Sequence, residues 1–223
     1  MHKTPIKKEA VLLGATGLIG KELVQQLLNH PNYSKITILL RRKSELKHPK
    51  LIEQIVDFDK PQDWGKLVIG DELYMAFGTT LKKAGSKENQ YKIDVSYQFE
   101  VAKAAFNNGV KKLLLVSSSG ANSKSSVFYN HLKGQLEDKL QAFNFEKKII
   151  IRPSLLIGER PEKRAMEKFG IKLLNLLNLI NLANKYKAIP GSIVAKAMIN
   201  LANIENAKEE YTLNEIFLVA NNK

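Results

Sequence analysis

The sequence has 223 residues, enough for one domain of good size, and its 44% apolar and 26% charged residues are ordinary for a globular protein. It contains no cysteine, which excludes a disulfide framework, a thiol nucleophile and a cysteine metal site. The net charge is +13, but arginine occurs only at positions 41, 42, 152, 160 and 164, so the basic excess is almost all lysine. Because proteins that read nucleic-acid sequence usually rely on arginine, specific nucleic-acid binding is not expected.

The first residues lack the apolar core of a signal peptide. No run of about 18 apolar residues is present, so no integral membrane segment is predicted. We therefore expect a cytoplasmic protein. No metal site is predicted.

The first predicted elements are a strand over residues 10–13 and a helix over 18–28, joined by a turn that reads GATGLIG. Strand, glycine turn and helix in this order are typical of a dinucleotide site, where the pyrophosphate lies at the helix N-terminus. The first glycine permits the tight turn, the second lets the backbone approach the pyrophosphate, and the third lets the helix pack closely on the strand. The residues expected to contact the cofactor here are Gly14, Thr16, Gly17, Leu18, Ile19 and Gly20.

A second predicted strand, over residues 36–40, ends in Arg41 and Arg42. Sheets that bind NAD usually carry an acidic residue at this position, which holds the 2′-hydroxyl of the ribose. Two guanidinium groups would instead bind a 2′-phosphate by charge-assisted hydrogen bonds. The pair therefore favours NADP(H) as the cofactor.

Two further strands are predicted over residues 52–56 and 73–77, followed by a helix over 90–108. Asp57 and Phe58 follow the first of these strands, where they either flank the adenine or simply end the strand. At the end of the second strand, small residues suit a close approach to the ribose and diphosphate. The candidate contacts there are Phe77, Gly78 and Thr79.

The strand predicted over residues 113–116 and the helix from about 127 to 142 carry the candidate catalytic residues. Tyr129 and Lys133 are four positions apart, so they share one face of the helix. A phenol normally loses its proton at about pH 10, and a nearby ammonium stabilises the phenolate, which makes the pair a usable acid and base. A serine at the end of the strand would hold the substrate oxygen as charge develops there. Ser118 is the first choice for this role and Ser117 the second.

The last predicted strand, over residues 148–151, runs into Arg152 and Pro153. Proline ends the strand, and its neighbours are expected to line the nicotinamide. The candidate contacts are Pro153, Leu155 and Leu156.

The alternation of short apolar runs with helices predicts an α/β fold of the Rossmann type, a doubly wound parallel sheet covered on both faces. We expect a single domain over residues 1–223, in which the part from about 153 to 223 forms a small, mostly helical C-terminal cap. Residues 169–183 are strongly apolar. They are interpreted as a helix over the sheet edge and substrate cleft, with a surface that faces lipid or a partner as the alternative.

These motifs resemble the short-chain dehydrogenase/reductase superfamily, and more closely its atypical Tat-interactive-protein type, from about residue 9 to 160. The resemblance implies a Rossmann fold, NADP(H) binding and a Ser-Tyr-Lys site. One departure stands out: many members carry a helix Asn that completes a proton relay, whereas this helix reads Ile93-Asp94-Val95. Besides the glycine turn, the matching stretches are Phe77-Gly78-Thr79-Thr80, Lys83-Ala84-Gly85-Ser86, Val116-Ser117-Ser118, Gly120-Ala121, Ser125-Ser126, Tyr129 with Lys133-Gly134, and Arg152-Pro153.

The sequence therefore predicts an NADP(H)-dependent oxidoreductase that reduces a carbonyl, or oxidises an alcohol, of a small apolar molecule. Tyr129 exchanges the proton, Lys133 tunes it, and Ser118 orients the oxygen; Tyr129 and Lys133 also contact the cofactor. One alternative is a nonenzymatic NADPH-binding regulator that acts through a protein partner. A second is a nucleotide-sugar epimerase or dehydratase. A homodimer is compatible with each of these functions.

Overall fold

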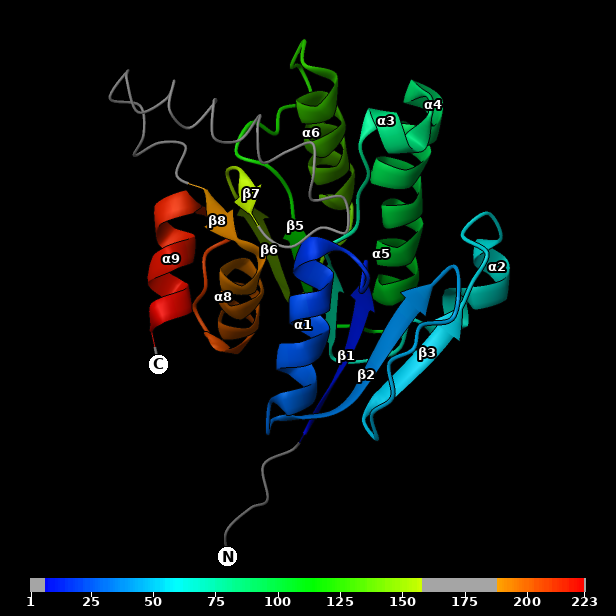
Figure 1. The fold of residues 1–223 in the computed structure, drawn as a ribbon, viewed down its shortest axis with the longest axis vertical. Helices are drawn as coiled ribbons and strands as arrows, with labels where there is room; N and C mark the ends of the chain where they lie inside the picture. The colour runs from blue at the N-terminus through cyan, green and yellow to red at the C-terminus, as the bar shows by residue number, and fades with distance from the viewer. Residues whose placement is uncertain (1–6, 158–187, 223) are drawn as a thin grey trace, which may run out of the picture.

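A seven-stranded sheet lies at the centre of the protein (Figure 1). The computed structural model describes residues 7–157 and 188–222. Every pairing in the sheet is parallel, and the order is β3-β2-β1-β4-β5-β6-β9, which confirms the predicted doubly wound sheet of the Rossmann type. The strands are β1 (Lys8–Leu13), β2 (Tyr33–Leu40), β3 (Leu51–Ile55), β4 (Glu72–Met75), β5 (Lys112–Val116), β6 (Lys147–Arg152) and β9 (Glu210–Thr212); β7 (Leu156–Ile157) and β8 (Ile189–Pro190) form a separate pair.

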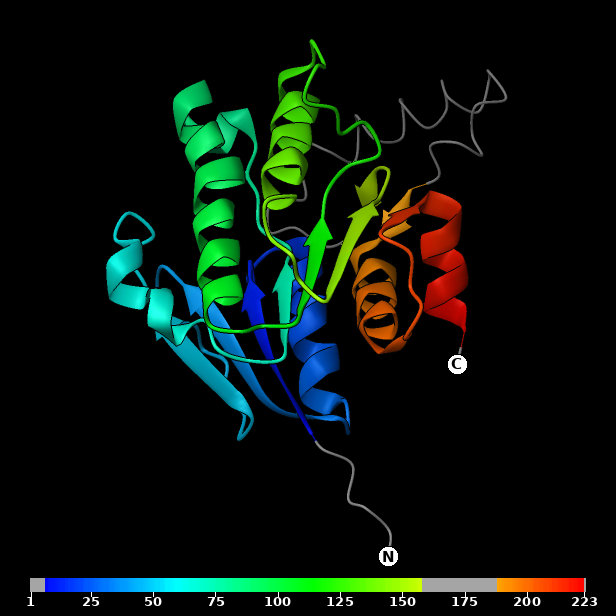
Figure 2. The same cartoon turned by 180° about the vertical axis from the view of Figure 1, so that it is seen from behind.

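Helices cover both faces of the sheet, as Figures 1 and 2 show from opposite sides. Alternate residues of β1 point to opposite faces: Ala10 and Leu12 enter the core beneath α1 and α8, while Val11 and Leu13 enter the core beneath α5 and α6. The long helices are α1 (Leu18–Asn29), α5 (Tyr97–Asn107), α6 (Phe128–Leu140), α8 (Gly191–Asn203) and α9 (Leu213–Asn221). Shorter helical segments are α2 (Pro61–Trp64), a 3-10 turn (Gly65–Leu67), α3 (Leu81–Ala84), α4 (Lys87–Tyr91) and a π-helical turn (Lys92–Ser96).

The order of the strands reverses between β1 and β4. From β1 the chain proceeds to β2 and β3 at one edge, whereas β4, β5 and β6 follow one another toward the other edge. Open α/β sheets bind dinucleotides in the crevice at the carboxyl ends of such central strands. The dinucleotide crevice is therefore expected at the loops that follow β1 and β4.

The six strands expected from the sequence are all present, but two regions differ from expectation. The helix predicted over residues 90–108 consists of α4, the π-helical turn and α5 in succession. The described C-terminal residues, 188–222, are mostly helical as predicted, yet they also supply a seventh strand of the central sheet, β9, which pairs with β6. This strand was missed because its three residues, Glu210 to Thr212, form no apolar run.

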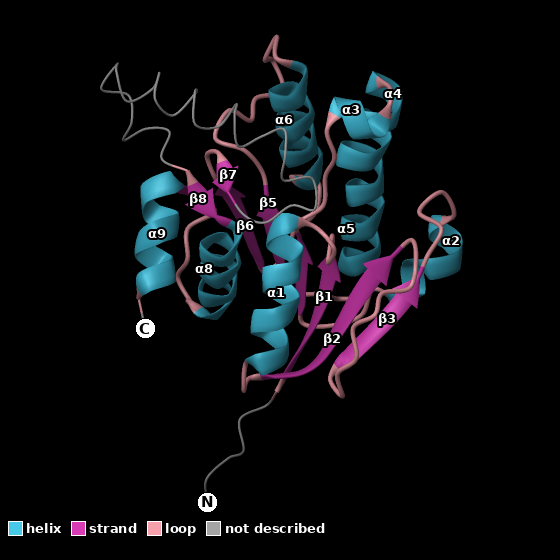
Figure 3. Ribbon diagram, viewed as in Figure 1, coloured by secondary structure: helices cyan, strands magenta, loops and turns pink. Residues whose placement is uncertain are grey.

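Helix α8 lies beside α1 on one face of the sheet (Figure 3). A Cβ at Gly191 would lie 3.0 Å from the Leu18 carbonyl oxygen, and Gln26 donates a hydrogen bond of 3.1 Å to the Ser192 carbonyl. The C-terminal part thus supports the helix that follows the glycine turn. Residues 169–183 lie outside the described residues, so their assignment stays a prediction. Among the described helices, none has both the length and the apolar character needed to cross a bilayer.

A buried network joins the amino ends of the central strands. The Glu72 carboxylate of β4 accepts hydrogen bonds from the Tyr33 hydroxyl at 2.6 Å and the Tyr74 hydroxyl at 2.8 Å. The ammonium groups of Lys8 and Lys112 lie 2.9 and 3.4 Å from the same carboxylate. Burial raises the pKa of both Tyr33 and Tyr74, which keeps these phenols neutral and able to donate. The network lies at the end of the sheet opposite the glycine turn.

Candidate functional site

The glycine turn joins β1 to α1 at the carboxyl edge of the sheet. Gly14 has a φ of +95°, and a Cβ there would lie 2.3 Å from the Ala76 carbonyl oxygen in the loop after β4. A Cβ at Gly20 would lie 1.9 Å from the Gly14 carbonyl oxygen, and the Gly17 amide donates to that oxygen at 2.9 Å. The turn is therefore tight, and only glycine fits at its first and third glycine positions.

The N-terminus of α1 receives no cap from the described side chains. Gly17 is its N-cap, no side chain caps it, and its first turn contains no acidic residue. Thr16 is exposed, whereas Ile19 and Gly20 are buried against the strand. Unpaired amides and the helix dipole favour a negatively charged group at this end. The turn can hold a pyrophosphate through its backbone, with Thr16 as the accessible side chain.

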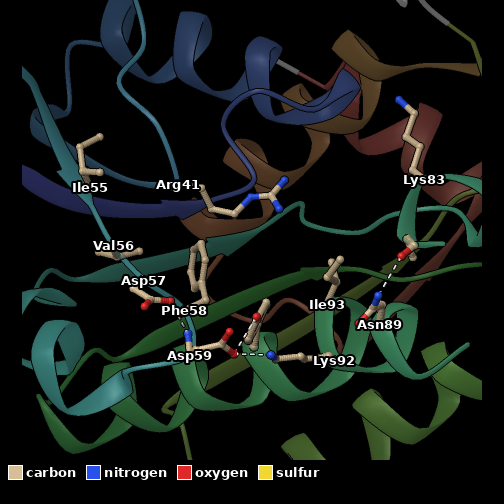
Figure 4. A pocket seen from close by; sticks show the side chains of 12 residues that line it. Arg41, Ile55, Val56, Asp57, Phe58, Asp59, Lys83, Asn89, Lys92 and Ile93 are labelled. Carbon is tan, nitrogen blue, oxygen red and sulfur yellow. Dashed lines mark hydrogen bonds and ion pairs between the residues drawn. The ribbon is translucent and has the colours of Figure 1, made fainter. Parts of the chain in front are cut away.

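A hollow of about 660 Å³ lies at the carboxyl ends of β2 and β3 (Figure 4). Arg41 extends into this space from the end of β2, and Asp57 and Phe58 line it from the end of β3. Arg42 is also exposed, but it is not among the lining residues. The structure thus separates the two predicted arginines, since only Arg41 faces the hollow.

The wall of the hollow is an aromatic cluster with a charged rim. Phe58 is buried against Tyr97 and Phe77, with ring centroids 5.4 and 5.7 Å away. Asp59 accepts a 2.8 Å hydrogen bond from the Tyr97 hydroxyl and pairs with Lys92 at 2.6 Å. An apolar wall with a few fixed polar groups suits a flat ring such as a nucleotide base.

The loop after β4 lies against the predicted catalytic lysine. A Cβ at Gly78 would lie 3.0 Å from Asp94 Oδ1 and 3.3 Å from Lys133 Nζ. The Thr79 amide donates a 2.8 Å hydrogen bond to the same Asp94 oxygen. Phe77, the residue that precedes Gly78, is half-buried. The structure therefore brings the predicted residues of this loop next to the predicted lysine of α6.

Tyr129 and Lys133 share one face of α6, as their spacing predicts. Lys133 Nζ lies 5.7 Å from the centroid of the Tyr129 ring. Lys133 is only 3% exposed, whereas Tyr129 is 42% exposed. Within the described part of the chain, the Lys133 ammonium forms no hydrogen bond or ion pair, so its protons are available to a ligand.

The two candidate serines have different surroundings. Ser117 is buried and donates to Glu137, whose carboxylate also accepts hydrogen bonds from Arg152 at 3.1 and 2.5 Å. Ser118 is half-buried, and its hydroxyl oxygen accepts from the Gly120 amide at 3.3 Å. The Ser118 hydroxyl therefore keeps its own proton for another acceptor, while the Ser117 proton is used inside the fold.

The end of β6 lies beside the serine loop. The Ser119 amide donates to the Pro153 carbonyl at 3.0 Å. Leu155 is exposed, and Leu156 begins the short strand β7. These residues therefore lie near the serine loop at the carboxyl end of the sheet, where Leu156 packs against the core beneath α1 and α8.

The sequence interpretation did not assign a role to Asp94 or to the pair of Glu137 and Arg152. Asp94 offered one signal, a carboxylate between the apolar residues Ile93 and Val95. Glu137 offered no such signal. It lies four positions after Lys133, a spacing that is common for polar residues on the surface of a helix.

A sequence profile described as NAD(P)H-binding matches residues 14–173 of the chain. The chain belongs to this family. The match begins at the glycine turn and spans every predicted site residue. A nicotinamide cofactor is thereby supported, and the preference for NADP(H) stays a prediction.

Relatives of this NAD(P)H-binding chain include proteins named FMP52, mitochondrial. The one from Candida glabrata is 34% identical over 207 residues, which are 92% of this chain and 87% of the relative. The one from Candida albicans is 38% identical over 160 residues, 70% of each chain. These names contradict the predicted cytoplasmic location. The prediction was wrong because it depended on the lack of a secretory signal, which does not exclude an organelle.

Solved structures similar to this NAD(P)H-binding chain include nucleotide-sugar epimerases. UDP-glucose 4-epimerase from Thermotoga maritima has a TM-score of 0.70 at 14% identity, covering 95% of this chain and 81% of the epimerase. WbmG from Bordetella bronchiseptica, solved with NAD, has a TM-score of 0.62 at 12% identity, covering 96% and 87%. At these identities the likeness shows the Rossmann-type fold.

Proposed function

We propose that the protein is an NADP(H)-dependent oxidoreductase of the short-chain dehydrogenase/reductase type, nearest its Tat-interactive-protein members. The observation that carries this proposal is the position of the buried Lys133 ammonium. It lies against the Gly78 backbone on one side and 5.7 Å from the exposed Tyr129 ring on the other. An ammonium in this position can bind the ribose of a dinucleotide and, at the same time, stabilise the phenolate of the neighbouring tyrosine.

In the proposed reaction a bound nicotinamide supplies or accepts the hydride. Tyr129, an exposed residue, gives its proton to a carbonyl oxygen or takes one from an alcohol. The Lys133 ammonium stabilises the phenolate that this transfer leaves. Ser118 donates a hydrogen bond to the substrate oxygen as charge develops there. The exposed side chains of Val127 and Leu155 support a small apolar substrate.

Replacing Tyr129 with phenylalanine tests this function. We expect the kcat for reduction of a carbonyl substrate by NADPH to fall at least about 100-fold, because the proton donor is lost. NADPH affinity should change little, since the ring remains. The measurement is a screen of carbonyl compounds by NADPH oxidation, with Tyr91→Phe as a control that removes a phenol hydroxyl from α4. Turnover that survives the Tyr129 change would refute the assignment.

We also propose that NADP(H) is preferred over NAD(H) because Arg41 faces the hollow. Arg41→Ala is expected to weaken NADPH binding about 10- to 100-fold through the loss of a charge-assisted hydrogen bond, with little effect on NADH. Arg42→Ala is the matched control, since it removes the same charge from the next residue. Fluorescence titration with both cofactors measures the effect. Equal losses for NADPH and NADH would contradict the 2′-phosphate assignment.

The screen also separates the two alternative functions. NADPH binding without turnover of any carbonyl would favour a regulator that acts through a protein partner. The nucleotide-sugar alternative is favoured by one observation, the epimerase fold of the similar solved structures. Interconversion of UDP-sugars by the protein would support it.

We propose that the protein acts in mitochondria, on the ground that its FMP52 relatives carry that location in their names. Expression of the full chain with a C-terminal fluorescent fusion tests this location. Fluorescence that coincides with a mitochondrial marker is the expected result.

A further inference from the structure

A buried carboxylate lies behind the proposed acid and base. Asp94 belongs to the π-helical turn Lys92–Ser96 and is fully buried. Turns of this kind are rare, and they occur frequently at functional sites because the extra residue changes where side chains point. Here Lys92 pairs outward with Asp59, while Asp94 faces the interior.

Asp94 is bound to the loop that carries Gly78. Its Oδ1 accepts from the Thr79 amide at 2.8 Å, and its Oδ2 accepts from the Gln90 side chain at 3.3 Å. The position of a Cβ on Gly78 is 3.0 Å from Asp94 Oδ1 and 3.3 Å from Lys133 Nζ. Carboxylate and ammonium therefore approach the same point of the loop from two different elements.

The charges around Asp94 are few. Among the described residues, Lys133 of α6 is the charged group that acts on its carboxyl, while Gln90 of α4, Gln98 of α5 and the Thr79 amide are neutral. Burial raises the pKa of Asp94, and the Lys133 charge and the hydrogen bonds oppose that rise. Removing a charge from a buried site that excludes water changes the electrostatic energy of neighbouring charges more than removing one at the surface.

We propose that Asp94 is a positioning residue for the reaction proposed above, on which this inference rests. Its carboxylate holds the Gly78 loop through the Thr79 amide and attracts the Lys133 ammonium across that loop without a direct ion pair. A negative charge beside the ammonium also cancels part of the field that Lys133 exerts on Tyr129. Loss of the Asp94 charge would strengthen that field on the phenol, which has to carry a proton in order to donate to a carbonyl.

Asp94→Asn tests this inference, because asparagine keeps an acceptor for the Thr79 amide and removes only the charge. The phenolate absorbance of Tyr129 is measured as the difference between each protein and its Tyr129→Phe counterpart. We expect the Tyr129 phenolate absorbance to appear at a pH at least about 0.5 unit lower in Asp94→Asn than in the wild type. The alkaline limb of the kcat profile should move the same way, with KM for NADPH little changed. Asp138→Asn makes an equal charge change on the exposed face of α6 and should shift neither the phenolate titration nor the kcat profile.

An unchanged phenolate titration, or an equal shift in the two variants, would overturn the inference. Should Asp94→Asn fail to fold, Asp94→Glu provides the second test, since it keeps the charge and should retain the wild-type titration at a lower kcat. The absorbance titration needs no substrate. If the wild-type protein showed no turnover, the proposed function would be refuted. The absorbance titration would still decide whether Asp94 acts on Tyr129.

Discussion

Gly20→Ala is expected to abolish NADPH binding and to lower the free energy of unfolding by about 3 kcal/mol. A Cβ at this position would lie 1.9 Å from the Gly14 carbonyl oxygen and 2.7 Å from its carbon. Both atoms belong to backbone, so neither can rotate away as a side chain would. The turn must open, and the amides at the start of α1 then no longer converge on one anion. NADPH fluorescence titration and urea unfolding measure the two effects.

Gly65→Ala is the control for this substitution. The nearest atom to a Cβ on Gly65 is the Ala104 Cβ at 3.7 Å, an ordinary contact, and its φ of −52° suits any residue. Its stability and cofactor affinity should stay close to wild type. If Gly20→Ala bound NADPH as tightly as the wild type, the glycine turn would not be the pyrophosphate site.

Glu72→Ala should lower the free energy of unfolding by about 3–5 kcal/mol, since it leaves buried phenols without their carboxylate acceptor and two partly buried ammonium groups without their counter-charge. The substitution removes the acceptor of two phenol donors, Tyr33 and Tyr74, and the counter-charge of Lys8 and Lys112. Because the network lies at the opposite end of the sheet from the cofactor turn, the folded fraction should bind NADPH normally. Urea unfolding followed by far-ultraviolet circular dichroism measures the change.

Glu9→Ala provides the comparison for this second prediction. Glu9 pairs with Lys35 at the surface, where both side chains are about one-third exposed, and such pairs contribute at most about 1 kcal/mol. A loss for Glu72→Ala no greater than that for Glu9→Ala would show that the buried network does not stabilise the fold.

Most of the sheet was predictable because its strands are short apolar runs covered on both faces. The runs around Leu12, Ile38 and Leu114 are buried residues of this kind. Strand β9 was not predictable, since Tyr211 is its one buried side chain and its pairing with β6 is decided by distant contacts. The π-helical turn was equally hidden, because its sequence has the apolar spacing of an ordinary helix.

The candidate site could be predicted where a motif combines residue type with spacing. Tyr129 and Lys133 share a helix face because four positions are about one turn, and the tight turn at Gly14 follows from its place after a strand. The difference between Ser117 and Ser118 could not be predicted, because it depends on Glu137, twenty positions away, as the partner of one of them. The role of Asp94 likewise depends on a contact between α6 and a turn that local sequence does not specify.

The link between β1 and α8 has a consequence for synthesis on the ribosome. Lys8 of β1 donates to the Asn203 side chain at 2.6 Å, across 195 positions, and Lys112 donates to the Ala202 carbonyl at 2.7 Å. Helix α8 also completes the core beneath α1. A nascent chain that ends before α8 therefore exposes the apolar face of α1, and Lys8 of its first strand lacks its Asn203 acceptor. The nucleotide-binding half cannot finish folding co-translationally until residue 203 has left the exit tunnel, so chaperones have an extended period in which to bind it.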